Sequence, residues 1–140
     1  MRGYVNEYSH EGAHLLVGRQ GALCGNVQRV TGKFYATEHA VVTTGKGKDV
    51  NIDWAFHMLT AMNLNRYATK SAQPGLAVSK LATVKIPVPP LEEQARIAAI
   101  LDSFDALVNN MAIGLPAELT ARRQQYQYYR DRMLTFREAA

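Results

Sequence analysis

Four histidines and one adjacent acid–base pair are the residues of this chain best suited to catalysis or metal binding. The histidines are His10, His14, His39 and His57. None of them forms an i, i+4 pair on a predicted helix, and no Asp-x-His or His-x-x-Glu grouping supports metal ligation. Glu38 beside His39 suggests the acid–base dyad of a small hydrolase or deaminase, but neighbouring residues on a strand point to opposite faces. The pattern therefore predicts a non-enzyme with no metal and no cofactor.

A glycine-containing loop is the next candidate for chemistry. The segment Arg19-Gln20-Gly21-Ala22-Leu23-Cys24-Gly25 follows a predicted strand. Such a loop can bring backbone N–H groups and a guanidinium to a phosphate. It lacks the Gly-Lys-Ser/Thr of a Walker A loop, and no predicted helix opens after it as in a dinucleotide-binding motif. A phosphate-binding loop and a plain hairpin turn with a surface arginine both stay open at this point.

The uneven charge of the chain favours a polyanionic partner. Residues 1–90 hold ten Lys or Arg against five Asp or Glu, and residues 91–140 hold six against seven, which gives the net charge of +4. The basic part makes nucleic acid the leading candidate. The single cysteine, Cys24, excludes an internal disulfide and a cysteine zinc knuckle. No window approaches the ~20 apolar residues of a membrane span and no signal-peptide run begins the chain, so a cytoplasmic location without a membrane partner is expected.

The first half of the chain has the pattern of a small mixed or antiparallel sheet with one packed helix. Short apolar runs separated by glycine turns predict strands over residues 14–17, 26–30, 33–37 and 40–43. Thr31-Gly32 is predicted as a hairpin tip between two of these strands. Apolar residues at a 3.6-residue spacing predict a helix over 51–64, with Asn51 or Asp49 as its N-cap. A short helical segment near Ser79–Ala82 and an edge strand over Val84–Val88 complete this half.

The second half is predicted to be a long helical arm. Three prolines end the sheet, and Pro90 is well placed at the start of a helix. Gly114 and Pro116 predict a break, followed by a second helix that extends to about Arg137. Apolar residues of the first helix recur at spacings of 4, 3, 4, 3 and 4, which is the seam of a helix that pairs with another helix. The seam residues are Ile97, Leu101, Phe104, Val108, Met111 and Leu115.

The passage from Lys85 to Asp102 carries a recognisable motif. It reads Lys-Ile-Pro-Val-Pro-Pro-Leu-Glu-Glu-Gln-Ala-Arg-Ile-Ala-Ala-Ile-Leu-Asp. This closely resembles the I-P-x-P-P-L-x-E-Q-x-x-I-x-x-x-L-D signature of the specificity (S) subunits of type I restriction-modification systems. The tail from Gly114 to Phe136 is similar to the second stretch of that family's spacer helix, and residues 15–37 are similar to the back half of its target-recognition domain. The resemblance covers nearly the whole chain.

The resemblance implies an α+β fold in two parts, with a partial DNA-recognition domain over residues 1–88 and a helical spacer and dimerisation region over 89–140. A full subunit of that family is not catalytic. It has two recognition domains whose long helices pair antiparallel, reads a split DNA sequence, and docks methyltransferase (M) and restriction (R) subunits. This chain has one such domain without its opening strands, so a homodimer through the helices would rebuild the two-domain architecture. A half-subunit, a truncated reading frame and a fragment all stay open.

Double-stranded DNA is the partner that the resemblance and the basic loops predict together. A helix of ~33 Å equals about ten base pairs, so paired helices can act as a ruler between half-sites. Arginine and lysine are expected at phosphates or guanine, and glutamine can pair with adenine. The expected DNA contacts are Arg19, Gln20, Gly21, Lys46, Lys48, Lys70, Gln73 and Lys80. The alternative is a coiled-coil interaction or oligomerisation module whose small β domain does not bind DNA.

Overall fold

A three-stranded antiparallel sheet forms one side of the molecule. The computed structural model describes residues 6–45, 47–110 and 116–135. The sheet has the order β3-β2-β5, with β2 at His14–Gly18, β3 at Val27–Val30 and β5 at Ala40–Thr43. Leu15 and Val17 of the central strand are buried, and they alternate with half-buried neighbours. The predicted short strands are present, with that over 33–37 limited to Lys33–Phe34, and of the two predicted kinds of sheet the structure has the antiparallel one.

A two-stranded ribbon lies beside the sheet. It consists of β1 (His10–Glu11) paired antiparallel with β4 (Lys33–Phe34). The predicted hairpin tip at Thr31-Gly32 is wrong, because the strands on its two sides pair with different partners. The hairpin that joins β2 to β3 closes instead over residues 19–26, which contain the 3₁₀ turn η1 (Gly21–Leu23). The chain bends at Gly32 as expected. The alternation of apolar and polar residues alone does not identify the partner of a strand.

Helix α1 (Ile52–Ala61) packs on the sheet. Its N-cap is Asn51, whose side-chain oxygen accepts hydrogen bonds from the backbone N–H groups of Asp53 and Trp54, at 2.9 and 3.0 Å. This contact decides between the two caps that the sequence allows. Trp54 and Met58 are buried on the inner side of the helix. The predicted helix is therefore confirmed, with an end at Ala61 rather than at residue 64.

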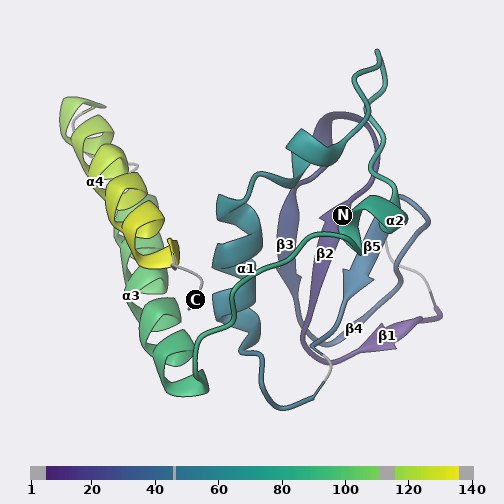
Figure 1. Cartoon of the computed structure of the whole chain (residues 1–140), viewed down its shortest axis with the longest axis horizontal. Coiled ribbons are helices and arrows are strands. Elements are labelled where there is room, and N and C mark those ends of the chain that lie inside the picture. Colours follow the sequence, from purple (N-terminus) through teal and green to yellow (C-terminus); the bar gives the residue numbers. More distant parts are fainter. Residues whose placement is uncertain (1–5, 46, 111–115, 136–140) are drawn as a thin grey trace.

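The segment between α1 and the last two helices is mostly irregular. It contains the 3₁₀ turn η2 (Leu64–Tyr67) and the short helix α2 (Val78–Leu81). The predicted helical segment is thus present, but Ala77 precedes it and Ser79 lies inside it rather than at its cap. The edge strand predicted for residues 84–88 is wrong, since these residues form no strand. Proline removes ladder donors there, and the chain crosses from the sheet to the helices (Figure 1).

Two long helices form an antiparallel hairpin on the far side of α1 (Figure 1). They are α3 (Leu91–Asn110) and α4 (Pro116–Leu134). Helix α1 lies between the sheet and this hairpin, so the molecule has three layers. The predicted α+β class and the two helical segments are confirmed. The connection between them, with the predicted break at Gly114, lies outside the described residues.

One buried cluster joins the three layers. It includes Leu15 and Val17 from the sheet, Trp54 from α1, and Ile97 and Leu101 from α3. A contiguous cluster of this kind is a single hydrophobic core. The first half of α3 is therefore part of the core rather than a free arm, and the division of the chain at residue 88 stays a prediction.

Candidate nucleic-acid interface

The end of strand β2 lies beside a loop, residues 69–76, that projects beyond the sheet (Figure 1). The backbone N–H of Leu76 donates to the carbonyl of Arg19 at 2.8 Å. Gln20 and Gly75 form an isolated antiparallel bridge. These backbone contacts hold the projecting loop against the end of the hairpin.

The contact between these segments brings five of the predicted DNA-binding residues to one end of the molecule. Lys70 and Gln73 are exposed on the projecting loop, and Gln20 is exposed on the hairpin beside it. Arg19 and Gly21 flank Gln20 in the chain, and the N–H of Gly21 donates to a carbonyl of the loop. We call this set the loop end: Arg19, Gln20, Gly21, Lys70 and Gln73.

The other predicted lysines are spread over the surface. Lys80 is exposed on α2, which follows the projecting loop. Lys48 is exposed beyond the far end of β5, the end where Thr43 pairs with Leu15. The sheet therefore separates Lys48 from the loop end. Lys46 lies outside the described residues, and DNA contact stays a prediction for all eight positions.

Two side-chain contacts organise the loop end. A ring nitrogen of His39, Nδ1, donates to the amide oxygen of Gln20 at 2.9 Å if that nitrogen carries the proton. Arg19 donates from Nη1 to the carbonyl of Glu38 at 3.2 Å, while its buried Nε has no partner within the described part of the chain. Glu38 and His39 occupy a turn before β5, so their predicted strand placement is wrong. The sequence interpretation missed His39 as the residue that orients Gln20.

The glycine-containing segment is a tightly bonded turn. The N–H of Cys24 donates to the carbonyl of Gly21 at 3.1 Å, and that of Gly25 donates to the carbonyl of Gly18 at 2.8 Å. Gly21 in turn donates to Pro74 of the projecting loop at 3.2 Å. Because these backbone donors are already bonded within the protein, they do not form an open cradle for a phosphate. The contacts favour the hairpin turn over the phosphate-binding loop.

A charge network joins β3, α1 and α3 on the face of the sheet that α1 covers. Arg29 of β3 donates to Asp53 of α1 and to Asp102 of α3, each at 2.8 Å. Asp102 also lies 2.9 Å from Nε2 of His57, which is 1% exposed. The guanidinium carbon of Arg29 stands 4.2 Å from the centroid of the Phe56 ring. Sequence analysis missed this network, although Asp102 directly follows the seam residue Leu101.

The network also explains a possible metal-binding arrangement. His57, Asp102 and Asp105 each place one ligand atom within 4.8 Å of the others. Burial opposes ionisation of Asp102, but the hydrogen bonds and charges of Arg29 and His57 outweigh it and lower the pKa of that carboxyl. The guanidinium of Arg29 already supplies the positive charge that a metal ion would bring. We therefore interpret His57 and Asp102 as members of an ion-pair network with Arg29.

A spacing typical of zinc proteins also occurs in the ribbon. His10, Glu11 and His14 have the His-Glu-x-x-His order, which holds zinc when both histidines lie on one helix face. Here they belong to β1 and β2. The ring of His10 stacks on Phe34 with centroids 5.4 Å apart, and Nε2 of His14 lies 2.9 Å from the carbonyl oxygen of Glu11. The strand geometry does not support the zinc interpretation.

Gln94 connects the first turn of α3 to the loop before α1. It is fully buried. Its side-chain oxygen accepts from the N–H of Asn51 at 2.7 Å, and its amide nitrogen donates to the carbonyls of Asp49 and Pro89 at 2.9 and 2.7 Å. Three hydrogen bonds nearly saturate a buried amide, so the position of α3 at this point is closely specified.

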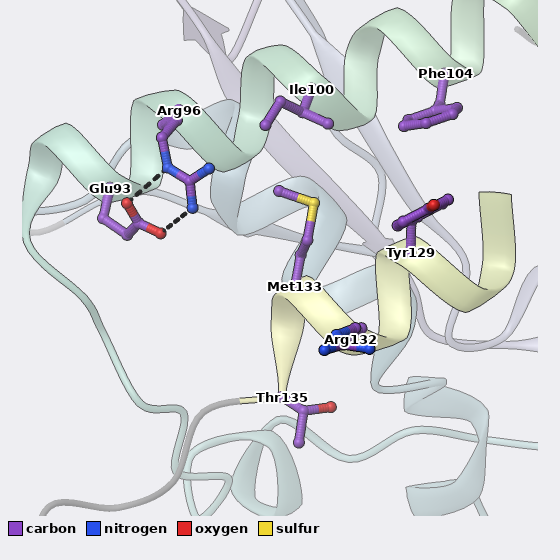
Figure 2. Close-up of a pocket in the computed structure, with 8 residues that line it drawn as sticks. All are labelled: Glu93, Arg96, Ile100, Phe104, Tyr129, Arg132, Met133 and Thr135. Atoms are coloured by element: carbon purple, nitrogen blue, oxygen red, sulfur yellow. Dashed lines mark hydrogen bonds and ion pairs between the residues drawn. The ribbon is translucent and has the colours of Figure 1, made fainter. Parts of the chain in front are cut away.

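The helical hairpin carries an open groove of about 550 Å³ between α3 and α4 (Figure 2). Ile100, Phe104 and Met133 supply its apolar surface, and Tyr129 stacks on Phe104 with centroids 5.7 Å apart. Figure 2 shows the Glu93–Arg96 ion pair near one end of the groove. The complete lining is Glu93, Arg96, Ile100, Phe104, Tyr129, Arg132, Met133 and Thr135.

The predicted seam divides between the core and the groove. Ile97 and Leu101 are 1% and 0% exposed within a single chain. The expectation that they need a second chain is wrong, because they share the core with α1. Phe104 lines the groove and Val108 is half-buried, so pairing between copies through this part of the seam stays a prediction. Two seam residues lie outside the described residues, Met111 and Leu115.

Comparisons with known proteins agree on one family. The family model described as the type I restriction modification DNA specificity domain matches residues 1–121. The type I restriction enzyme EcoprrI specificity subunit of Escherichia coli is 68% identical over 111 residues, which cover 79% of this chain and 27% of that subunit. The chain thus belongs to the family of type I restriction-modification DNA specificity domains.

Two solved structures share the fold. A type I restriction-modification S subunit from M. genitalium superimposes with a TM-score of 0.66 at 19% identity, over 79% of this chain and 30% of that one. A chain from a structure of an assembled type I restriction-modification system gives 0.67 at 18% identity, over 93% and 32%. This chain therefore spans about a third or less of each of these three proteins. Within its described part, no helix is both long and apolar enough to cross a membrane.

Proposed function

We propose that this chain is a sequence-specific DNA-recognition module of a type I restriction-modification specificity subunit, and that it reads one half of a split DNA site. The grouping of Arg19, Gln20, Lys70 and Gln73 at the loop end is the observation that supports this most directly. Guanidinium, ammonium and amide groups are the groups that contact phosphates and base edges in DNA complexes. Membership of the family indicates DNA as the ligand, and the loop end is the surface that we propose contacts it.

The proposed roles follow from the chemistry of each side chain. Gln20 and Gln73 read bases, because an amide can pair bidentately with adenine in the major groove. The contact with His39 orients the Gln20 amide before DNA binds. Lys70 and Lys80 contact phosphates, which position the duplex without reading it. Lys48 contacts a phosphate only where the duplex runs past the far end of the sheet, and a phosphate is also the proposed contact of Lys46.

The chain is further proposed to act without catalysis or a cofactor of its own. Methyl transfer and DNA cleavage then belong to M and R subunits that dock on α3 and α4. Two copies pair through the outer side of the helical hairpin and so place two recognition modules on one DNA. The half-buried apolar side chains of Ile100 and Met133 support this arrangement, because a second helical surface would cover them.

The groove also favours a second candidate function, a protein-interaction module that does not bind DNA. The two functions differ in their response to salt. Each phosphate contact releases counterions, so DNA affinity falls steeply as salt rises, whereas an apolar protein groove responds much less. Measuring affinity against salt concentration with duplex DNA therefore separates them.

The decisive experiment is selection of duplex DNA from a random pool, followed by affinity measurements on the selected sequence. We expect Gln73→Ala to relax preference at one base position, at a cost of about 1–3 kcal/mol on the preferred base. Lys70→Ala should weaken binding to all sequences about equally and lower the salt slope by about one. Lys85→Ala is the matched charge control, since Lys85 is exposed on the segment between the sheet and α3. Failure to enrich any sequence would refute the proposal.

A further inference from the structure

The docking of α3 on the rest of the molecule is more polar than a core contact requires. Ile97 and Leu101 already bury the apolar side of the helix. Apolar contacts are non-directional, so they hold a helix in place but tolerate small rotations and shifts along its axis. Hydrogen bonds to charged and buried groups are directional and shorter in range. Two sets of such bonds flank the apolar contacts.

The first set is the buried amide of Gln94, with its three bonds to backbone groups of Asn51, Asp49 and Pro89. Two of these groups belong to the loop that leads into α1, and the third belongs to the chain just before α3. The amide therefore fixes the start of α3 against the start of α1. A rotation of α3 about its axis would break the bonds to Asn51 and Asp49 together, whereas the bond to Pro89 is local to the start of the helix.

The second set is the Arg29 network, two turns further along α3. Arg29 links Asp102 to Asp53, and Asp102 also meets His57, so β3, α1 and α3 meet at one carboxylate. Gln94 and Asp102 are eight residues apart, which is ~12 Å along a helix at 1.5 Å per residue. Two fixed points on a rod define its direction. The Arg29 network therefore fixes the direction of α3, and the Gln94 amide fixes its start.

We propose that Gln94 and Arg29 are positioning residues that hold α3 at one angle to the sheet, and thereby set the geometry in which the loop end meets DNA. The proposal rests on the proposed function for its second half only. The loop end belongs to the sheet layer, and the groove through which two copies pair belongs to α3 and α4. The angle between those layers therefore fixes the separation of the two recognition modules in a pair. Neither residue belongs to the loop end, and both act through α3.

A distance measurement tests the angle without DNA. Spin labels are placed at two exposed positions, Thr37 on the sheet side and Asn109 on α3, in a Cys24→Ser background diluted with unlabelled chain. The parent should give a narrow distance distribution. Gln94→Leu and Arg29→Met, each with unchanged helical content, should broaden it at least about twofold. Arg122→Met is the matched control, because Arg122 pairs with Glu118 within α4 and lies outside the groove lining, and it should leave the width unchanged.

Two further results decide the proposal. Arg29→Lys keeps the charge but loses the forked contact, so an intermediate width supports positioning and also serves if Arg29→Met does not fold. Equal widths in the parent, Gln94→Leu and Arg29→Met would overturn it. On DNA, the variants should keep affinity for one half-site and lose dependence on the spacing of two half-sites; an equal loss for single and paired sites would instead indicate a purely structural role. Absence of DNA binding by the parent refutes the proposed function, and the distances still judge the positioning role.

Discussion

Asp102 is the residue on which the polar contacts of three elements converge. Its carboxylate accepts from Arg29 and meets His57, while its side chain is 39% exposed. We expect Asp102→Asn to lower the free energy of unfolding by about 1–2 kcal/mol near neutral pH, a value reduced by solvent screening. Urea unfolding of both proteins gives the difference directly.

The same substitution has a signature in acid. The pKa of Asp102 is below its ordinary value in the folded chain. The stabilisation is therefore fully present above the unfolded pKa of about 3.9, and it disappears as pH falls through the lower folded pKa. The difference between the parent and Asp102→Asn should shrink in that window, since the other carboxyls titrate in both proteins. A difference that stays constant down to the acid limit would contradict the assignment.

Tyr126 gives a test at the opposite end of the pH scale. Burial, together with the charge and hydrogen bond of Asp105, raises its pKa to about 12. Its contribution to stability is complete below the ordinary pKa of about 10 and is lost as pH rises through about 12. Ultraviolet titration should show the phenolate of Tyr126 forming near pH 12. Tyr126→Phe should remove that late step, and Asp105→Asn should move it to lower pH.

These polar residues also mark the limit of what sequence could predict. The seam correctly identified Ile97 and Leu101 as residues to be buried. Gln94 lies three residues before Ile97 on α3, and Asp102 directly follows Leu101. Polar residues beside an apolar seam are usually solvated. The partners of these two residues are far away in the sequence, on β3 and before α1. Only the packing of the three layers reveals the hydrogen-bond partners of Gln94 and Asp102.

At the scale of elements, the turn between β2 and β3 depends on Gly25. Its φ is +81°, and an added Cβ would overlap the backbone of Asn65, with the Cα of Asn65 at 2.7 Å. Gly25→Ala should therefore cost about 3 kcal/mol or more, from strain in the left-handed region plus a backbone clash. Gly21→Ala is the control, because its φ is +69° but an added Cβ meets nothing within 4 Å. That change should cost about 1 kcal/mol in thermal or urea unfolding.

Elements were predictable from sequence where local signals decide them, and less so where pairing decides them. The apolar spacing correctly predicted α1, and Asn51 was one of the two N-caps that the sequence allowed. The hairpin tip at Thr31-Gly32 failed because β4 turns away from β3 to pair with β1. The strand over residues 84–88 failed because alternation there has no neighbouring strand to pair with. Partner choice is a property of the whole fold.

At the scale of the whole molecule, the long helices are shorter in reach than a free arm. Helix α4 returns along α3, and α1 covers the first half of α3 (Figure 1). The sequence indicated two helices and a break, and it assigned the apolar seam of the first helix to pairing between two copies of the chain. The hairpin halves the reach, so the domain and the helices form one core. What is left for a second chain is the outer groove.

The groove between α3 and α4 allows a test of pairing between two copies of the chain. Met133 lines the groove and is half-buried in one chain. In a symmetric pair, Met133→Glu places a charge at both copies of the contact and removes about 0.8–1.5 kcal/mol of apolar burial from each, because the side chain is already half-buried in one chain. Since 1.4 kcal/mol is a factor of ten, the dissociation constant of the pair should rise by at least about 10-fold.

Light scattering across a concentration series measures the change. Gln127→Glu adds the same charge at an exposed position of α4 outside the groove lining, and it should leave the mass unchanged. A parent chain that is monomeric throughout the series would exclude pairing through the groove. A parent that dimerises equally well with Met133→Glu would place the contact elsewhere on the molecule. Loss of the dimer in Met133→Glu alone would identify the groove as the surface through which two recognition modules are held together.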